Sequence, residues 1–297
     1  MVPSPANVTC VERFTHEGLT FDVLDAGPPA GSAVVLLHGF PQDATAWDQV
    51  ASRLHAHGLR TLAPHQRGYS PGARPGRVSA YRMKHLVGDV LALLDAAGLE
   101  QAHVVGHDWG GAVAWSLAQH RPERVASLTV LSTPLPRALA WATRHGDQWR
   151  RSWYLLAFLA PVAPERILAR QLGDGALLRQ GVPDDHQQRY AARLGSPAAL
   201  RGPLNWYRAA LRPGGWRDPW HELDEPGVLS AEPVRVPTTL VWGRRDPYLG
   251  RDAVERTARH VEADYRFVEL DAGHWLPERE PDAVATAVLA RAGGPQT

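Results

Sequence analysis

The chain has 297 residues, 44% of them hydrophobic and 21% charged, so it can bury a sizeable core. Its net charge is only +1 and its basic residues form no stripe, which argues against a nucleic-acid-binding protein. The single cysteine, Cys10, excludes an intrachain disulfide and a cysteine-based metal site. No apolar run is long enough to span a membrane and the first residues do not resemble a secretory signal, so we expect a cytoplasmic protein without membrane contact.

Strand and helix patterns alternate from about Ser32 onward. Apolar runs typical of buried strands occur at Ala33–Leu37, Leu59–Ala63, Gln101–His107 and Val125–Ser132. Helical patterns occur between them, at Trp47–His57, Tyr81–Ala97 and Gly110–His120. The segment from Cys10 to Asp25 precedes this series and is typical of a β-hairpin. The alternation predicts an α/β protein, with a mostly parallel sheet and helices on both faces.

The pattern changes after Thr133. The stretch 134–230 is helical or irregular and rich in Trp, Arg and Pro, and strand signals return at Thr238–Trp242 and Arg266–Leu270, followed by a helix at Pro281–Ala292. We therefore expect a discontinuous core, residues 1–133 and 231–297, and an inserted helical cap domain, residues 134–230. Such a cap would cover the carboxyl ends of the strands, where open α/β sheets bind ligands.

Asp108 occupies the centre of the segment Gly106-His107-Asp108-Trp109-Gly110-Gly111, between a predicted strand and a predicted helix. A sharp strand-to-helix turn brings two backbones together, so only small residues fit around it. The central side chain is then held above the sheet, beside the N–H groups of the helix N-terminus. An ordinary helix cap would not require glycines on both sides. We therefore interpret Asp108 as a nucleophile on such a turn.

A second segment, Gly68-Tyr69-Ser70-Pro71-Gly72, matches the G-x-S-x-G pattern of serine esterases. The turn that carries a serine nucleophile must lead directly into a helix, whereas here more Pro and Gly residues follow. We interpret this segment as a surface loop.

The residue type at position 108 selects the chemistry. A carboxylate, with an ordinary pKa near ~3.9, is ionised at neutral pH and needs no base to attack. Its attack on a saturated carbon gives an alkyl ester that water can cleave, whereas serine would give an inert ether. Asp108 therefore favours displacement at a C–O or C–halogen bond over acyl transfer.

The base and its orienting acid follow two later strands. His274 stands in a Gly-containing loop after the strand that ends near Leu270, and Asp246 follows the strand at Thr238–Trp242. This order of nucleophile, acid and histidine is that of a hydrolase triad. Asp246 would hold His274 in the required tautomer and stabilise its charged form.

The loop after the first parallel strand supplies the remaining polar contacts. It reads His38-Gly39-Phe40-Pro41, and we expect the backbone N–H groups of Phe40 and Trp109 to form an oxyanion hole. A cis Phe40-Pro41 peptide is also expected. We place His38 and Pro41 in the same substrate-binding region.

These motifs resemble the epoxide hydrolase branch of the α/β-hydrolase superfamily, on both sides of the insertion. The resemblance implies an eight-stranded, mostly parallel sheet with an inserted helical cap. Two cap segments, Gly202-Pro203-Leu204-Asn205-Trp206-Tyr207-Arg208 and Ser152-Trp153-Tyr154, resemble the stretches that carry the ring-opening tyrosines. The resemblance therefore implies that Tyr154 and Tyr207 donate hydrogen bonds to the epoxide oxygen, and phenols can protonate a departing alkoxide.

Two alternatives remain open. A haloalkane dehalogenase shares the Asp-Trp pair of the turn, although many of those enzymes carry Asn where Phe40 stands; a fluoroacetate-type dehalogenase would want Arg after the nucleophile, where Trp109 stands. A non-catalytic small-molecule receptor could use the same fold. The favoured hypothesis is an epoxide hydrolase that needs a small apolar epoxide and water, and neither a metal nor an organic cofactor. The sequence leaves the oligomeric state open, a homodimer included.

Overall fold

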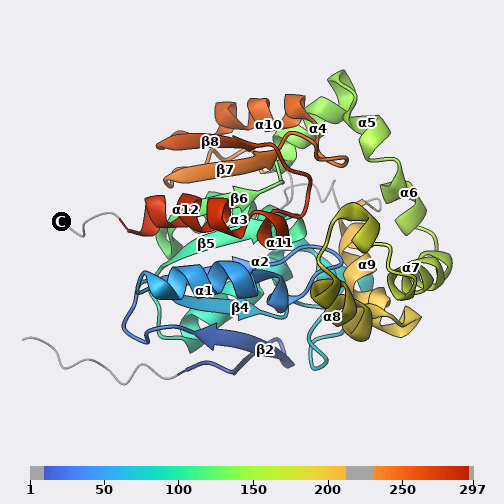
Figure 1. Cartoon of the computed structure of the whole chain (residues 1–297), viewed down its shortest axis with the longest axis horizontal. Coiled ribbons are helices and arrows are strands. Elements are labelled where there is room, and N and C mark those ends of the chain that lie inside the picture. Colours follow the sequence, from blue (N-terminus) through green and yellow to red (C-terminus); the bar gives the residue numbers. More distant parts are fainter. Residues whose placement is uncertain (1–9, 212–229, 294–297) are drawn as a thin grey trace, which may run out of the picture.

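The computed structural model describes residues 10–211 and 230–293 (Figure 1). The segment 212–229, which belongs to the predicted cap, and both chain ends lie outside this description. Within the described residues, no helix is long and apolar enough to cross a membrane.

The described residues form one eight-stranded sheet in the order β1-β2-β4-β3-β5-β6-β7-β8. Its strands are β1 (Arg13–His16), β2 (Leu19–Ala26), β3 (Ala33–Leu37), β4 (Arg60–Pro64), β5 (Ala102–His107), β6 (Val125–Leu131), β7 (Thr238–Gly243) and β8 (Tyr265–Leu270). The hairpin of β1 and β2 is antiparallel, and β2 also runs antiparallel to β4. All other neighbours are parallel. The predicted fold class, a mostly parallel sheet with an N-terminal hairpin, is confirmed.

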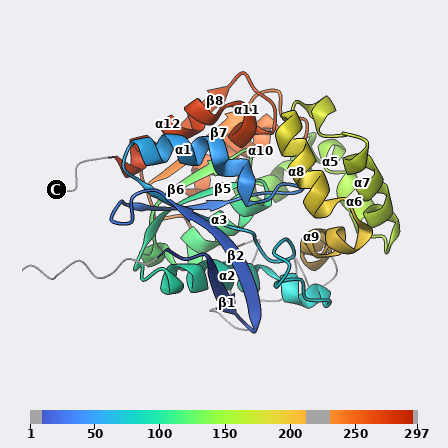
Figure 2. The same cartoon turned by 60° about the horizontal axis from the view of Figure 1, so that its bottom comes forward.

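The continuous apolar runs lie where helices cover both faces of the sheet. Every residue of β3, β4 and β7 is buried. Figure 2 shows α1 (Asp48–Ala56) and α12 (Pro281–Ala292) on one face, and α2 (Met83–Ala96) and α3 (Trp109–His120) on the other. Burial on both sides explains why these strands lack the alternating pattern of a half-exposed sheet.

The insertion between β6 and β7 is helical. It contains α4 (Pro136–His145), α5 (Gln148–Arg151), α6 (Tyr154–Phe158), α7 (Ala163–Gly173), α8 (Asp184–Leu194) and α9 (Pro197–Leu211). Figure 1 shows α6 to α9 together at one end of the sheet, while α4 packs against the core helix α10 (Arg251–Thr257). The short helix α11 (Leu276–Arg279) precedes α12. The division into a core and a cap at residues 134 and 230 remains our proposal.

Strand register brings the two predicted loops together. In the parallel pair of β3 and β5, Leu37 lies opposite Gly106. The residues that follow each strand, Phe40 and Asp108, therefore leave the sheet at the same edge. The insertion faces this edge, so the sheet presents its loops to the cap.

Candidate active site

Asp108 stands on a sharp turn between β5 and α3. Its backbone has φ 50° and ψ −120°, a conformation that non-glycine residues rarely adopt. A Cβ at Gly106 would lie 2.4 Å from the carbonyl oxygen of Gly110, and a Cβ at Gly110 would lie 2.1 Å from that of Leu37. The glycines around Asp108 are therefore required by close backbone contacts, as the sequence predicts.

The carboxylate of Asp108 has its two oxygens in different environments. The N–H of Phe40 donates to Oδ1 over 2.8 Å. Burial raises the pKa of Asp108, while the charge of His274 and the N–H groups of Phe40 and Trp109 oppose this rise. The predicted oxyanion donors thus face the carboxyl group, and the Phe40-Pro41 peptide is cis, as expected.

His274 lies between the two acidic residues. Its Nδ1 is 2.7 Å from Oδ2 of Asp246, and its Nε2 is 3.8 Å from Oδ2 of Asp108. The other oxygen of Asp246 accepts hydrogen bonds from the N–H groups of Tyr248 and Leu249, which fixes the carboxylate. Burial acts to lower the pKa of His274, but Asp246, together with Asp108 and Glu278, raises it overall.

His38 does not reach the pocket. It is fully buried, its Nδ1 contacts the carbonyl oxygen of Gly39 at 3.0 Å, and its Nε2 accepts the N–H of Gln66 at 3.3 Å. Burial lowers the pKa of His38 to about 4, so the ring is neutral at pH 7. The loop of His38 thus lies in the predicted substrate-binding region, but its side chain turns back to support the loop and does not line the cavity. Pro41 and Phe40 do line the pocket.

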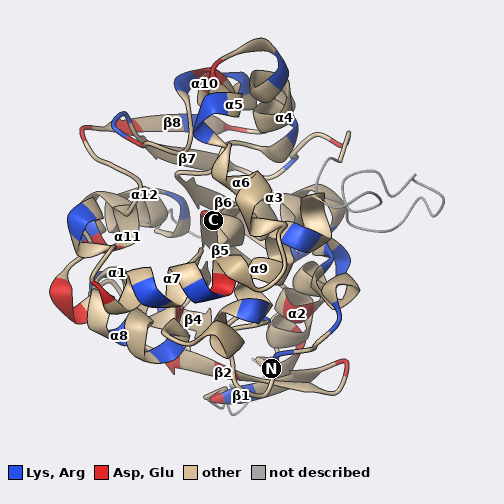
Figure 3. Cartoon of the chain, turned by 90° about the vertical axis from the view of Figure 1, so that its right-hand side faces the viewer, with Lys and Arg blue, Asp and Glu red and all other residues tan. Residues whose placement is uncertain are grey.

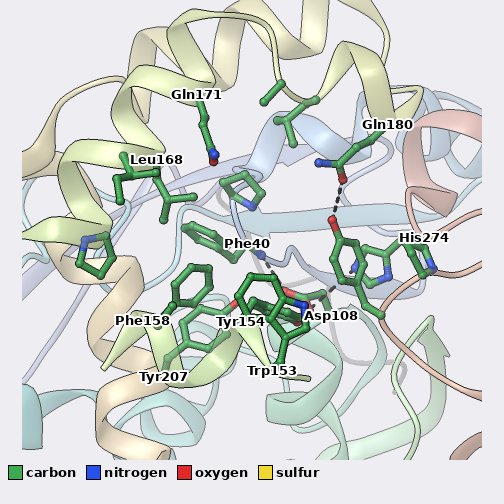
Figure 4. Close-up of a pocket in the computed structure, with 18 of the residues that line it drawn as sticks. Phe40, Asp108, Trp153, Tyr154, Phe158, Leu168, Gln171, Gln180, Tyr207 and His274 are labelled. Carbon is green, nitrogen blue, oxygen red and sulfur yellow. Dashed lines mark hydrogen bonds and ion pairs between the residues drawn. The ribbon is translucent and has the colours of Figure 1, made fainter. Parts of the chain in front are cut away.

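A cavity of about 940 Å³ opens above Asp108 and contains both predicted tyrosines (Figure 4). Tyr154 and Tyr207 line it together with Asp108 and His274. Burial, with the nearby charge of Asp108, raises the pKa of both phenols, so both carry their proton at neutral pH. The rest of the wall is mainly apolar, including Phe158, Ile167, Leu168, Leu172 and Leu177.

Tyr207 is held by a well-anchored helix. A Cβ at Gly202 would lie 2.6 Å from Cα of Gly68, so α9 packs directly on the loop after β4. One turn on, the indole N–H of Trp206 donates to the carbonyl oxygen of Arg67 over 2.8 Å. These contacts explain the Gly202 and Trp206 positions of the motif that surrounds Tyr207.

The two tyrosine rings approach the site from different helices. The ring of Tyr207 packs edge-on against Trp109, with centroids 5.0 Å apart, and against Phe40 at 5.7 Å. Tyr154 begins α6 and packs edge-on against Phe158 at 5.4 Å. The ring of Phe158 also touches Tyr207 at 4.9 Å, so one aromatic side chain links both tyrosines.

Tyr248 is a pocket residue that sequence reasoning missed. Its ring lies 5.0 Å from His274 and 5.6 Å from Tyr154, measured between centroids. Its hydroxyl donates to Oε1 of Gln180, from the insertion, over 2.8 Å. In the sequence, only its position two residues after Asp246 indicates that Tyr248 lies near the site.

A buried polar chain supports the His274 loop from behind. Nε2 of His107 lies 2.9 Å from the carbonyl oxygen of His274, and Nδ1 of His107 lies 2.7 Å from Oε1 of Gln42. The amide of Gln42 donates to Glu278 over 2.7 Å, and the hydroxyl of Tyr190, from α8, donates to the same carboxylate oxygen over 2.8 Å. This series of hydrogen bonds thus connects the insertion to the loop that carries His274.

The G-x-S-x-G segment is not a second nucleophile site. Ser70 lies in a turn after β4, where its hydroxyl donates to Asp22 over 3.1 Å. The loop interpretation is confirmed, but the surface location is wrong because Ser70 is fully buried against β2. Among the residues that the structure describes, no group of His, Cys, Asp and Glu side chains could hold a metal ion.

Comparison with known proteins places this geometry in a family. A family model described as alpha/beta hydrolase fold matches residues 32–281. AB hydrolase superfamily protein YfhM of Bacillus subtilis (strain 168) is 34% identical, over 92% of this chain and 94% of the relative. Epoxide hydrolase A of Mycobacterium tuberculosis (strain ATCC 25618 / H37Rv) is 33% identical, over the same shares of the two chains.

Solved structures of similar fold include proteins that are also described as epoxide hydrolases. The crystal structure of epoxide hydrolase A from Mycobacterium thermoresistibile is 29% identical, with a TM-score of 0.78 over 96% of this chain and 99% of that one. A structure described among novel epoxide hydrolases in metagenomes from hot environments is 28% identical, with a TM-score of 0.79 over 95% of this chain and 98% of that one. The chain belongs to the alpha/beta hydrolase superfamily, and its relatives there include epoxide hydrolases.

Proposed function

We propose that this protein is an epoxide hydrolase that converts an apolar epoxide and water to a vicinal diol. In the first half-reaction, a carboxylate oxygen of Asp108 attacks one epoxide carbon. The C–O bond breaks while Tyr154 and Tyr207 donate hydrogen bonds to the departing oxygen. One of the two phenols gives this oxygen its proton, and the resulting phenolate regains a proton from solvent. The product of this step is an ester between Asp108 and the hydroxyalkyl group.

The second half-reaction cleaves this ester. His274, oriented by Asp246, takes a proton from water, and the water oxygen attacks the carbonyl carbon of Asp108. The N–H groups of Phe40 and Trp109 stabilise the oxyanion that develops. Its collapse releases the diol, and the proton held by His274 goes to the leaving alkoxide. The carboxyl group of Asp108 loses its remaining proton to solvent and is again a carboxylate. The chemistry needs no group beyond these side chains and backbone amides.

One observation carries the proposal: two protonated tyrosines line the same cavity as Asp108 and His274. A halide leaving group needs hydrogen bonds but no proton, whereas an alkoxide needs a proton to leave. Phenol groups opposite a carboxylate nucleophile therefore suit an epoxide better than a haloalkane. The 33% identical relative named epoxide hydrolase A supports the same assignment.

A paired assay tests the substrate class. The purified protein is incubated with aryl and alkyl epoxides, with diol measured, and with matched bromoalkanes, with bromide measured. We expect diol formation without comparable bromide release. Bromide release without diol would instead assign a haloalkane dehalogenase, and no turnover of either, with tight binding, would assign a receptor.

The covalent step is tested separately by repeated turnover in heavy-oxygen water. The water oxygen enters the carboxyl group of Asp108 when the ester is cleaved at its carbonyl carbon. We expect the peptide that contains Asp108 to gain mass. An unlabelled peptide after many turnovers would mean that water attacks the epoxide directly.

A further inference from the structure

The exposed apolar side chains of this protein gather on one part of the chain. Among the described residues, eight large hydrophobic side chains are exposed, and six of them belong to the insertion. Five of these six, which we call the cap apolar patch, lie on α5, on α7 and in the segment between them: Trp149, Trp153, Leu156, Val162 and Ile167. Their exposed fractions range from 53% to 72%. Monomeric soluble proteins rarely expose such groups together unless the surface binds something.

Two members of the cap apolar patch also line the pocket. Trp153 and Ile167 line the cavity and are also 68% and 56% exposed, so the cavity meets solvent between them. Arg150 and Ala160 are further pocket-lining residues that are exposed. The exposed side of the cavity is therefore bordered by part of the apolar patch.

The same region is strongly basic. Residues 136–211 contain 11 arginines, no lysine and 5 acidic residues, a net charge of +6. The whole chain carries +1, so the remainder carries −5. The exposed arginines Arg166 and Arg170 flank Ile167 on α7, and the guanidinium of Arg150 lies 5.1 Å from the ring centre of Trp149. Figure 3 looks onto this face and shows basic segments on α5 and α7.

We propose that the cap apolar patch and its arginines dock the protein on an anionic lipid bilayer, with the pocket entrance facing the lipid. Trp side chains favour the membrane interface, apolar side chains insert below the headgroups, and arginines bind anionic headgroups. The role of this contact in taking up an apolar epoxide from lipid rests on the proposed function. The docking itself depends only on the surface.

This proposal changes the expectation that the protein makes no membrane contact. That expectation rested on the lack of an apolar run long enough to span a membrane, which says nothing of attachment to its surface. The low net charge of the whole chain also hides a basic insertion, because the remainder is acidic. In the described residues no helix can cross a membrane, which agrees with attachment to one leaflet. A second copy of the chain would suit the patch less well, because two insertions with a net charge of +4 over residues 134–230 repel each other.

Vesicle flotation tests the docking. The protein is mixed with vesicles of phosphatidylcholine, with or without phosphatidylglycerol. We expect flotation with the anionic vesicles that weakens as salt is raised. No flotation with anionic vesicles at low salt would overturn the proposal.

Two surface variants identify the face, using residues that do not line the pocket. Trp149→Ser with Leu156→Ser removes apolar contact, and Arg166→Glu with Arg170→Glu reverses charge. We expect each pair to reduce the floating fraction about fivefold or more, with unchanged turnover of a water-soluble epoxide. The matched control is Leu24→Ser with Phe267→Ser, which should float like the parent protein. In the described part of the chain, these are the two exposed large hydrophobic residues outside the insertion. Equal flotation of all variants would overturn the assignment of this face.

Sedimentation and kinetics complete the test. If the Trp149→Ser, Leu156→Ser variant turned a dimer into a monomer and the parent protein did not float, the patch would be a contact between copies. An apolar epoxide dissolved in anionic vesicles should be hydrolysed faster by the parent protein than by the surface variants. Flotation without any epoxide turnover would retain the docking surface and reject only the proposed function.

Discussion

Nε2 of His274 lies 3.8 Å from Oδ2 of Asp108, beyond hydrogen-bonding distance, while Nδ1 of the same ring lies 2.7 Å from Asp246. The ring is therefore tied to the acid and left free on the side of the nucleophile. A carboxylate needs no base for its attack, so the free nitrogen is available to a water molecule. In the proposed mechanism, this arrangement leaves His274 a role in the second half-reaction only.

Replacing His274 with alanine should stop the reaction at the ester. Asp108 keeps its oxyanion donors, so ester formation proceeds, but water is no longer activated. We expect the intact mass of His274→Ala to rise by the mass of one epoxide after mixing, with turnover reduced by at least about 10²-fold. The control, Asp108→Ala, should gain no mass, and a His274→Ala protein that fails to trap the epoxide would place His274 in the first half-reaction.

The pH dependence of ester cleavage should follow the proton of His274. The base must be neutral, so cleavage is fast above the pKa of His274 and is lost as the pH falls through it. Asp246 and Asp108 raise this pKa. Because the ester removes the charge of Asp108, the acidic limb of cleavage should lie at lower pH than the titration of His274 in the resting protein by NMR.

Asp246→Asn gives the matching variant. It removes the largest influence that raises the pKa of His274, so the acidic limb should move to still lower pH. The plateau rate of ester cleavage should fall on the order of 10³-fold, because the charged ring is no longer stabilised. Single-turnover measurements across pH provide both the plateau rate and the pH of the acidic limb. An unchanged acidic limb would mean that Asp246 does not set the pKa of His274.

The two tyrosines should act on ester formation alone. We expect Tyr207→Phe and Tyr154→Phe each to slow this step by about 10–100-fold, since each removes one donor to the leaving oxygen. Rapid mixing with mass detection measures the step, and the rate of ester cleavage serves as the internal control. If Tyr154→Phe left ester formation unchanged, the neighbouring hydroxyl of Tyr248 would be the second donor, and Tyr248→Phe would show it.

Local steric patterns explain why much of the fold and the sharp turn at Asp108 could be predicted. Buried parallel strands need continuous apolar runs, and the turn at Asp108 needs small residues on both sides, so each leaves a mark within a few positions of the sequence. The order of the candidate triad could be predicted because Asp108, Asp246 and His274 follow the ends of β5, β7 and β8. The Tyr207 segment was found by resemblance, and the structure supplies its physical reason in the contact of Gly202 with Gly68.

Long-range polar contacts produce no local sequence pattern of this kind. Gln42 and Glu278 are 236 positions apart, and nothing near either residue indicates that their side chains meet. His38 was placed in the site because its loop is there, yet the direction of a side chain depends on packing around it. Tyr248 was likewise missed, since its contact with Gln180 joins two parts of the fold.

The glycine at position 110 should be indispensable for stability. A methyl group there would lie 2.1 Å from the carbonyl oxygen and 2.5 Å from the carbonyl carbon of Leu37, and both belong to a buried strand. We expect Gly110→Ala to lower the free energy of unfolding by at least about 2–3 kcal/mol. Gly173→Ala is the control: its added methyl group meets nothing within 4 Å, so stability should change by less than about 1 kcal/mol. Urea unfolding compares the two, and equal midpoints would contradict the steric argument.

The polar chain behind His274 should affect ester cleavage more than ester formation. Oε1 of Glu278 accepts hydrogen bonds from Gln42 and Tyr190, and an amide oxygen can accept both of them. Glu278→Gln should therefore retain most activity. Glu278→Leu should leave the amide N–H group of Gln42 without its acceptor and loosen the hold of His107 on the His274 loop. We expect Glu278→Leu to slow ester cleavage about tenfold or more while ester formation changes less than about threefold. Equal losses in both half-reactions would indicate general structural damage, and a Glu278→Gln protein as slow as Glu278→Leu would mean that the charge of Glu278, rather than its hydrogen bonds, supports the base.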